Sequence, residues 1–78
     1  MKTVKILGPG CSNCRKLEAV AREAAASAGI EAEFVKVSDM KDIMAYDILS
    51  TPGLVIDETL MSSGRIPTQA EISQWLAG

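Results

Sequence analysis

The fold of this chain is organised around the stretch Gly8-Pro9-Gly10-Cys11-Ser12-Asn13-Cys14. It holds both cysteines of the protein and lies between a short apolar run and a long segment with helical periodicity. Two cysteines separated by two residues at such a junction form either a redox dithiol or half of a soft-metal site. A disulfide between Cys11 and Cys14 would close a very small loop and add little chain-entropy stabilisation, which favours a functional pair over a structural one.

The size and composition of the chain limit what it can be. Its 78 residues suffice for one domain, and we expect residues 1–78 to form it. The formal net charge is −2 and no basic run is interleaved with aromatic residues, so nucleic acid is not an expected partner. The apolar run at residues 4–7 is too short and too charged for a signal sequence. No window approaches the ~18 apolar residues of a membrane span.

The lack of a predicted signal sequence or membrane span indicates a cellular compartment. We expect a cytoplasmic monomer without a membrane partner. Cysteines in the cytoplasm are kept mostly reduced, and a pair at this spacing is there more often catalytic or metal-binding than structural.

Short apolar and β-branched runs predict four strands. The first stops at a Gly-Pro-Gly turn, and the third is a near-continuous apolar run typical of a central strand. The predicted strands cover residues 3–7, 30–37, 53–56 and 59–62. A tight turn at Asp57-Glu58 joins the last two, without the glycine that such turns usually prefer.

Three helices are predicted between and after these strands. Apolar residues at three- and four-residue steps predict a helix over residues 12–28 and a short amphipathic one over residues 40–48. Thr68 and Glu71 form a capping box that starts the last helix.

The resulting order, β-α-β-α-β-β-α, predicts an α/β fold. A strand, a crossover helix and a second strand make a parallel pair, while the closing hairpin is antiparallel. We therefore expect a four-stranded mixed sheet flanked by three helices.

Taken together, these elements resemble a minimal thioredoxin fold. More narrowly, the chain resembles the small glutaredoxin-like thioredoxins, also called the redox-active disulfide protein 2 family. The resemblance covers essentially the whole chain. It is carried by Cys11-Ser12-Asn13-Cys14, Ser50-Thr51-Pro52-Gly53-Leu54-Val55-Ile56 and Gly64-Arg65.

The resemblance implies an activity and assigns roles to residues. It implies a protein-disulfide oxidoreductase in which Cys11 attacks and Cys14 resolves. It also implies that the Thr51–Pro52 bond is cis and holds the Thr51 backbone beside the cysteines, where a substrate strand can pair with it. We expect the residues that contact the substrate to be Gly10, Ser12, Asn13, Thr51, Pro52 and Gly64.

The chain also departs from common thioredoxins. These place tryptophan, glycine and proline in and around the motif, and many keep a buried acid about six residues ahead of the first cysteine. Lys5 stands at that position here. Its side chain is expected to be solvated or edge-facing, with its stem over apolar surface; the alternative places its ammonium near the dithiol. Met40 and Met44 are expected to fill the core.

Thiol–disulfide exchange needs a thiolate and a second thiol within bonding reach. Cys11 lies at a helix N-terminus, where unpaired N–H groups and the helix dipole favour a thiolate. Cys14 lies one turn further on and is expected to point towards the core. Because Ser12 and Asn13 carry no charge, we expect a moderate lowering of the Cys11 pKa and a reductant rather than a strong oxidant.

The dithiol itself is the redox group, so no organic cofactor is expected. The expected partners are client proteins, that is, proteins whose disulfides are reduced, and an electron donor resembling thioredoxin reductase. Glutathione and a ferredoxin- or F420-linked enzyme are other candidate donors.

Two other functions compete with this one. Small carriers of copper, zinc or arsenite also place such a pair between a first strand and a first helix. They end in a strand, however, whereas this chain ends in a capped helix. The other alternative is a binding module in which the dithiol is vestigial and the Thr51–Pro52 edge captures peptides.

Overall fold

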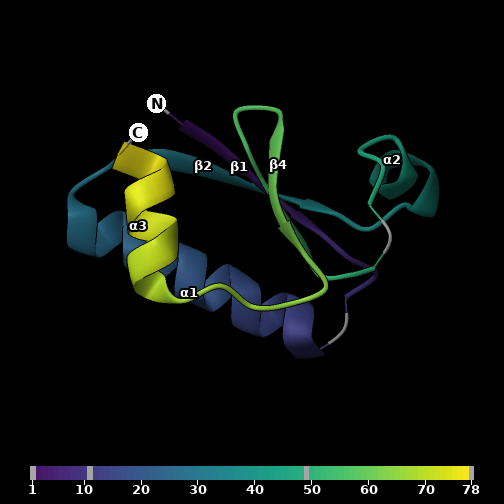
Figure 1. The fold of residues 1–78 in the computed structure, drawn as a ribbon, viewed down its shortest axis with the longest axis horizontal. Coiled ribbons are helices and arrows are strands. Elements are labelled where there is room, and N and C mark those ends of the chain that lie inside the picture. The colour runs from purple at the N-terminus through teal and green to yellow at the C-terminus, as the bar shows by residue number, and fades with distance from the viewer. Residues whose placement is uncertain (1, 11, 49, 78) are drawn as a thin grey trace.

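A computed structural model describes residues 2–10, 12–48 and 50–77 of the chain. The elements are β1 (Lys2–Leu7), α1 (Ser12–Ala28), β2 (Ala32–Val37), α2 (Met40–Met44), β3 (Gly53–Ile56), β4 (Thr59–Ser63) and α3 (Gln69–Ala77). The strands form one sheet in the order β2-β1-β3-β4 (Figure 1). β1 and β2 are parallel, and the other two pairs are antiparallel. The predicted α/β fold with a four-stranded mixed sheet and three helices is confirmed.

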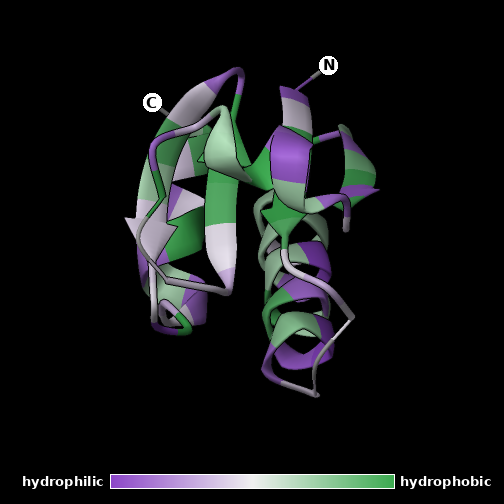
Figure 2. Ribbon diagram, turned by 90° about the vertical axis from the view of Figure 1, so that its right-hand side faces the viewer, coloured by the Kyte–Doolittle hydropathy of each residue, from purple (hydrophilic) through white to green (hydrophobic). Residues whose placement is uncertain are grey.

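The two faces of the sheet are covered unequally. α1 and α3 lie together on one side in Figure 1, whereas α2 lies apart from them. The larger hydrophobic cluster packs Leu17 of α1 and Ile72 of α3 against strand residues that include Val4, Ile6 and Leu54. A smaller cluster packs Ile43 of α2 against Leu7 and Val55 of the sheet. Hydrophobic and hydrophilic positions alternate along the ribbon in Figure 2, as a buried and a solvated face require.

α1 ends by a mechanism that local sequence explains. Gly29 adopts a left-handed φ of 67°. Its N–H donates to the Ala26 carbonyl at 3.2 Å, and the Ile30 N–H donates to the Ala25 carbonyl at 3.0 Å. These two bonds form a Schellman motif, which satisfies carbonyl groups that the helix end would otherwise leave unpaired. The next strand therefore starts at Ala32, two residues later than predicted.

The second helix differs from the prediction. α2 ends at Met44, and the chain turns through Asp47, whose φ is 57°. Met40 and Met44 are 56% and 66% exposed, so their predicted place in the core is wrong. A five-residue helix presents one narrow face to the sheet, and Ile43 occupies it. Tyr46 and Ile48, which follow the helix, complete the packing.

The capping box of the last helix is confirmed. The Glu71 N–H donates to Thr68 Oγ1 at 3.2 Å, and the Thr68 N–H donates to Glu71 Oε1 at 3.1 Å. Arg65 adds two hydrogen bonds to the same carboxylate, at 3.1 and 2.9 Å. The bonds from Arg65, followed by that from the Thr68 backbone, lower the pKa of Glu71 from 4.5 to about 2.

This shift predicts a pH-dependent contribution to stability. A carboxyl whose pKa falls on folding stabilises the folded state above its unfolded pKa, and this contribution is lost as the pH falls through its folded pKa. We expect Glu71→Gln to lower the melting temperature at pH 7. The difference from the wild type should shrink below about pH 5 and nearly vanish at pH 2. Thermal unfolding followed by circular dichroism tests this, with Glu23→Gln on the exposed face of α1 as control; a difference that persists at pH 2 contradicts it.

Candidate active site

Two strand ends bring distant parts of the chain together. Leu7 at the end of β1 pairs with Gly53 at the start of β3. The chain beyond β1 therefore lies beside the chain that precedes β3, which contains Thr51 and Pro52. The Thr51–Pro52 peptide bond is cis. Because α1 follows the loop after β1, its first turn starts at this same end of the sheet.

Cys14 is buried at this junction. It lies in the first turn of α1 and is 6% exposed, as expected for the inner member of the pair. Its partner in the motif, Cys11, lies outside the described residues. The described part of the site is therefore built around the Cys14 sulfur.

Gly8 is the position that the sequence analysis missed. A Cβ added there would lie less than 3.0 Å from Cys14 Sγ, 3.3 Å from Cys14 Cβ and 3.9 Å from Thr51 Cβ. The sulfur therefore packs where any other residue would place a side chain, with Thr51 close on the same side. The sequence offered a signal, because a glycine at a strand end often marks a close approach by another group.

Gly64 contacts the segment that contains Ser50 and Pro52. Its N–H donates to the Pro52 carbonyl at 2.9 Å. Its φ is 74°, and a Cβ there would overlap the Ser50 side chain. Of the other residues expected to contact a substrate, Ser12 and Asn13 are exposed in the first turn of α1, and Gly10 is exposed with a φ of 88°.

A cavity of about 330 Å³ opens next to Cys14. Its walls come from the end of β1 and the following loop, the start of α1, and the end of β2. The lining residues are Ile6, Gly8, Pro9, Gly10, Cys14, Arg15, Glu18, Lys36 and Ser38. It combines a buried sulfur with two cations and one carboxylate.

Glu18 is the carboxylate of this cavity and forms ion pairs with Lys36 and Arg22. Lys36 Nζ lies 3.1 Å from one of its oxygens, and Arg22 donates to the other at 2.9 Å. Only 15% of the Glu18 side chain is exposed. Burial alone would raise its pKa, but the hydrogen bonds from Lys36 and Arg22 outweigh that effect, and the net pKa is lowered.

Lys5 is partly solvated, with 24% of its side chain exposed, and its ammonium binds two partners from other parts of the chain. It shares the sheet face of Leu7, which α2 covers, while Val4 and Ile6 face α1. Its ammonium donates to the Tyr46 hydroxyl at 2.8 Å and pairs with Glu58. The hydrogen bond with Glu58, followed by that with Tyr46, raises the Lys5 pKa. These partners are 41 and 53 residues away in the chain, so the sequence did not reveal them.

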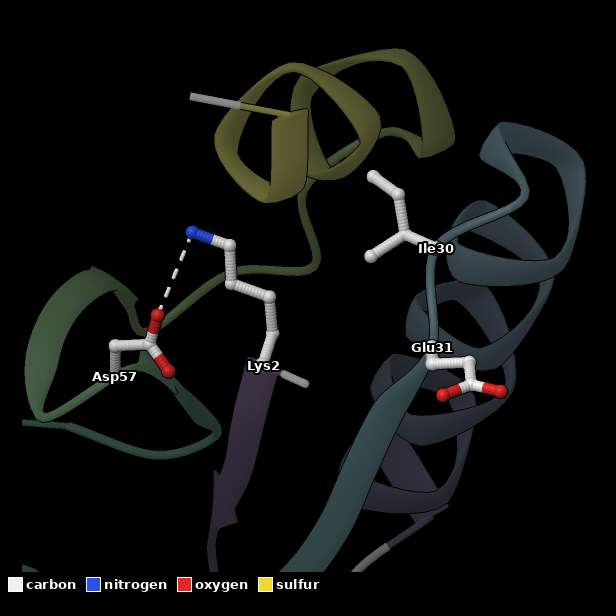
Figure 3. A pocket seen from close by; sticks show the side chains of 4 residues that line it. All are labelled: Lys2, Ile30, Glu31 and Asp57. Atoms are coloured by element: carbon white, nitrogen blue, oxygen red, sulfur yellow. Dashed lines mark ion pairs between the residues drawn. The ribbon is translucent and has the colours of Figure 1, made fainter.

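A further pocket lies at the opposite end of the sheet. It is lined by Lys2, Ile30, Glu31 and Asp57, and Lys2 and Asp57 form an ion pair of 3.4 Å across it (Figure 3). Lys2 starts β1, whereas the cysteine motif follows its end. This pocket is therefore separate from the site around Cys14.

No helix in residues 2–10, 12–48 and 50–77 is long and apolar enough to cross a membrane. Over the same residues, no group of three or more histidine, cysteine, aspartate or glutamate side chains is placed to hold a metal ion.

The sequence of this chain is similar to those of known thioredoxins. A profile of the thioredoxin domain family matches residues 2–77. A thioredoxin from Methanothermobacter thermautotrophicus is 40% identical, over 99% of this chain and all of that protein. A thioredoxin from Methanocaldococcus jannaschii is 34% identical, over 97% and 87% of the two chains.

Solved structures agree on the fold. Thioredoxin-2, described as a component of the protein secretion machinery of the malaria parasite, superposes with a TM-score of 0.69. That alignment covers 99% of this chain and 82% of the other, at 11% identity. The oxidised thioredoxin of Plasmodium falciparum gives 0.60 over 97% and 78%, at 12% identity. Because the family profile and both relatives match nearly the whole chain, this chain belongs to the thioredoxin family of thiol–disulfide oxidoreductases.

Proposed function

We propose that this protein reduces the disulfides of client proteins in the cytoplasm by dithiol exchange through Cys11 and Cys14. The observation that carries the proposal is the environment of the Cys14 sulfur. It is buried in the first turn of α1, packs against Gly8, and lies at the strand ends that also position Thr51 and Pro52. A thiol in this position is shielded from solvent and can react with a partner held one turn earlier.

The exchange proceeds in two displacements. The Cys11 thiolate attacks one sulfur of the client disulfide, forms a mixed disulfide and releases the first client thiolate. Cys14 then attacks the Cys11 sulfur and releases the second. The client gains two electrons, and the protein is left with a Cys11–Cys14 disulfide. A dithiol donor such as a thioredoxin-reductase-like enzyme restores the reduced form.

The position of Cys11 in the sequence supports its role as the attacking residue. It directly precedes Ser12, the first residue of α1, so it stands at the N-terminus of a 17-residue helix. The unpaired N–H groups and the dipole of such a terminus favour a negative charge and therefore a thiolate. Because thiolates are the nucleophiles in exchange, this position accelerates the first displacement.

Client binding is proposed at the rim of the site. An extended client segment would pair with the Thr51 backbone, in the manner of a strand added to an edge. The hydrogen bond from Gly64 to the Pro52 carbonyl holds this segment of the rim. Gly10, Ser12 and Asn13 are exposed around the cysteines and complete the contact surface.

The soft-metal carrier finds no support in the fold. Carriers of that class follow the order β-α-β-β-α-β, in which two strands directly follow the first helix, whereas here α2 separates β2 from β3.

Trapping the mixed disulfide tests the proposal. The wild-type protein is expected to accelerate the reduction of insulin by dithiothreitol at substoichiometric concentration. Cys14→Ser leaves the first displacement intact but blocks the second, so it should accumulate a covalent complex with insulin through Cys11, detectable by mass spectrometry. The matched control is the double variant Cys11→Ser/Cys14→Ser, which should form none. Absence of both turnover and the complex would contradict the proposed function.

A further inference from the structure

The resolving step needs a group that takes a proton from Cys14. A buried thiol must lose its proton as it attacks the mixed disulfide, since the thiolate is the nucleophile. Many thioredoxins keep a buried acid at the position of Lys5, but Lys5 is tied to Tyr46 and Glu58 on the other face of the sheet. The proton acceptor must therefore come from another element.

The cavity beside Cys14 offers few candidates. β1 and the following loop contribute Ile6, Gly8, Pro9 and Gly10, none of which titrates. The end of β2 contributes Ser38 and the ammonium of Lys36, and α1 contributes Arg15 and Glu18. Arginine stays protonated and a lysine ammonium has no acceptor. Among the described residues that line the cavity, Glu18 alone carries an ionised acceptor.

Glu18 is also well placed. It follows Cys14 by four residues on α1, and side chains at this spacing lie one above the other with Cβ atoms about 5–6 Å apart. Both side chains line the same cavity, which has room for a bridging water. Lys36 and Arg22 bind one carboxylate oxygen each and fix the orientation of the group. The side chain is largely buried, with 15% exposed.

We propose that the Glu18 carboxylate accepts the Cys14 proton, directly or through one water, during the resolving step. The inference rests on the proposed dithiol exchange. As the Cys14–Cys11 bond forms, the bond from Cys11 to the client sulfur breaks and the client leaves as a thiolate. The Cys14 proton passes to Glu18, which releases it to solvent or to the leaving thiolate. The two cations keep Glu18 ionised before the transfer.

Two variants distinguish the role of the Glu18 carboxylate from that of its salt bridge with Lys36. Glu18→Gln removes both the proton acceptor and the ion pair with Lys36. Lys36→Gln breaks the same ion pair but keeps the carboxylate, and it leaves Glu18 a stronger base. If Glu18 acts as a proton acceptor, the two variants should differ; if only the salt bridge matters, they should behave alike.

A two-phase kinetic experiment tests the proposal. Reduced protein is mixed in a stopped-flow instrument with an equimolar aromatic disulfide such as Ellman's reagent. The first coloured thiolate reports attack by Cys11, and the second reports resolution by Cys14. For Glu18→Gln we expect an unchanged first phase and a second phase slowed about tenfold, less than the usual 10²–10⁴ for a general base because water reaches the cavity. Lys36→Gln should keep a second phase at least as fast as the wild type.

Controls distinguish the ways in which this can fail. Glu23→Gln, the same substitution on the exposed face of α1, should leave both phases unchanged. A second phase in Glu18→Gln within twofold of the wild type would overturn the role of Glu18, as would equal slowing in Lys36→Gln. If the wild type shows no second thiolate release, the proposed exchange itself fails, whatever the variants do.

Discussion

Replacing Cys11 by serine is expected to lower the rate of protein-disulfide reduction at least about a thousandfold, to the uncatalysed background. A serine hydroxyl is not ionised at neutral pH and is a poor nucleophile towards sulfur, so the first displacement stops. Insulin reduction by dithiothreitol, followed as turbidity, measures this directly.

The fold provides the control for this variant. In the sequence Cys11 directly precedes Ser12, the first residue of α1, and serine is a good residue at a helix N-terminus. Far-UV circular dichroism and the melting temperature of Cys11→Ser should therefore match those of the wild-type protein in its reduced form. Retention of more than about 1% of the wild-type rate would show that Cys11 is not the attacking residue.

The second large effect is expected from Gly8→Ala. The added Cβ would overlap Cys14 Sγ at less than 3.0 Å, and both groups are buried. Relief requires the sulfur or the end of β1 to move, and such overpacking typically costs about 1–3 kcal/mol. We expect a lower midpoint in chemical denaturation, together with slower resolution, because the added methyl group displaces the sulfur that carries out the resolving step.

A double-mutant cycle identifies the cause. Cys14→Ala removes the sulfur that the new methyl group meets, so Gly8→Ala should cost little in that background. Gly29→Ala is the matched control: Gly29 has a left-handed φ of 67° but no atoms within 4 Å of the added Cβ. Its cost should be the same with or without Cys14. Additive costs for Gly8→Ala and Cys14→Ala would contradict the contact.

The sequence predicted the parts of the fold that depend on local rules. The predicted bounds of the long helix agree with the observed ones because its apolar positions recur at helical spacing and because Gly29 can end it in a left-handed conformation. The last helix was found from Thr68 and Glu71, which recognise each other across one turn. Both signals act over a few residues, so no knowledge of the tertiary structure was needed.

The missed features depend on contacts between distant residues. Met40 and Met44 have helical spacing, but the helix is too short to bury them. Lys5 is fixed by Tyr46 and Glu58, which only the folded chain brings near it. The importance of Gly8 follows from the sulfur that α1 places against it. Of the site, the sequence indicated the cysteines and Thr51-Pro52, while the cavity with Glu18 became visible only in three dimensions.

The turn at Asp57-Glu58 influences the distant site through strand alignment. Both residues adopt a positive φ, 48° and 68°, without glycine. Asp57 exchanges two hydrogen bonds with Thr3, at 2.9 and 3.0 Å. These bonds lock β3 against β1 in one register, and a slip of one residue would turn every side chain of β3 to the opposite face. The pairing that sets Thr51 beside Cys14 is thus enforced from the far end of the same two strands.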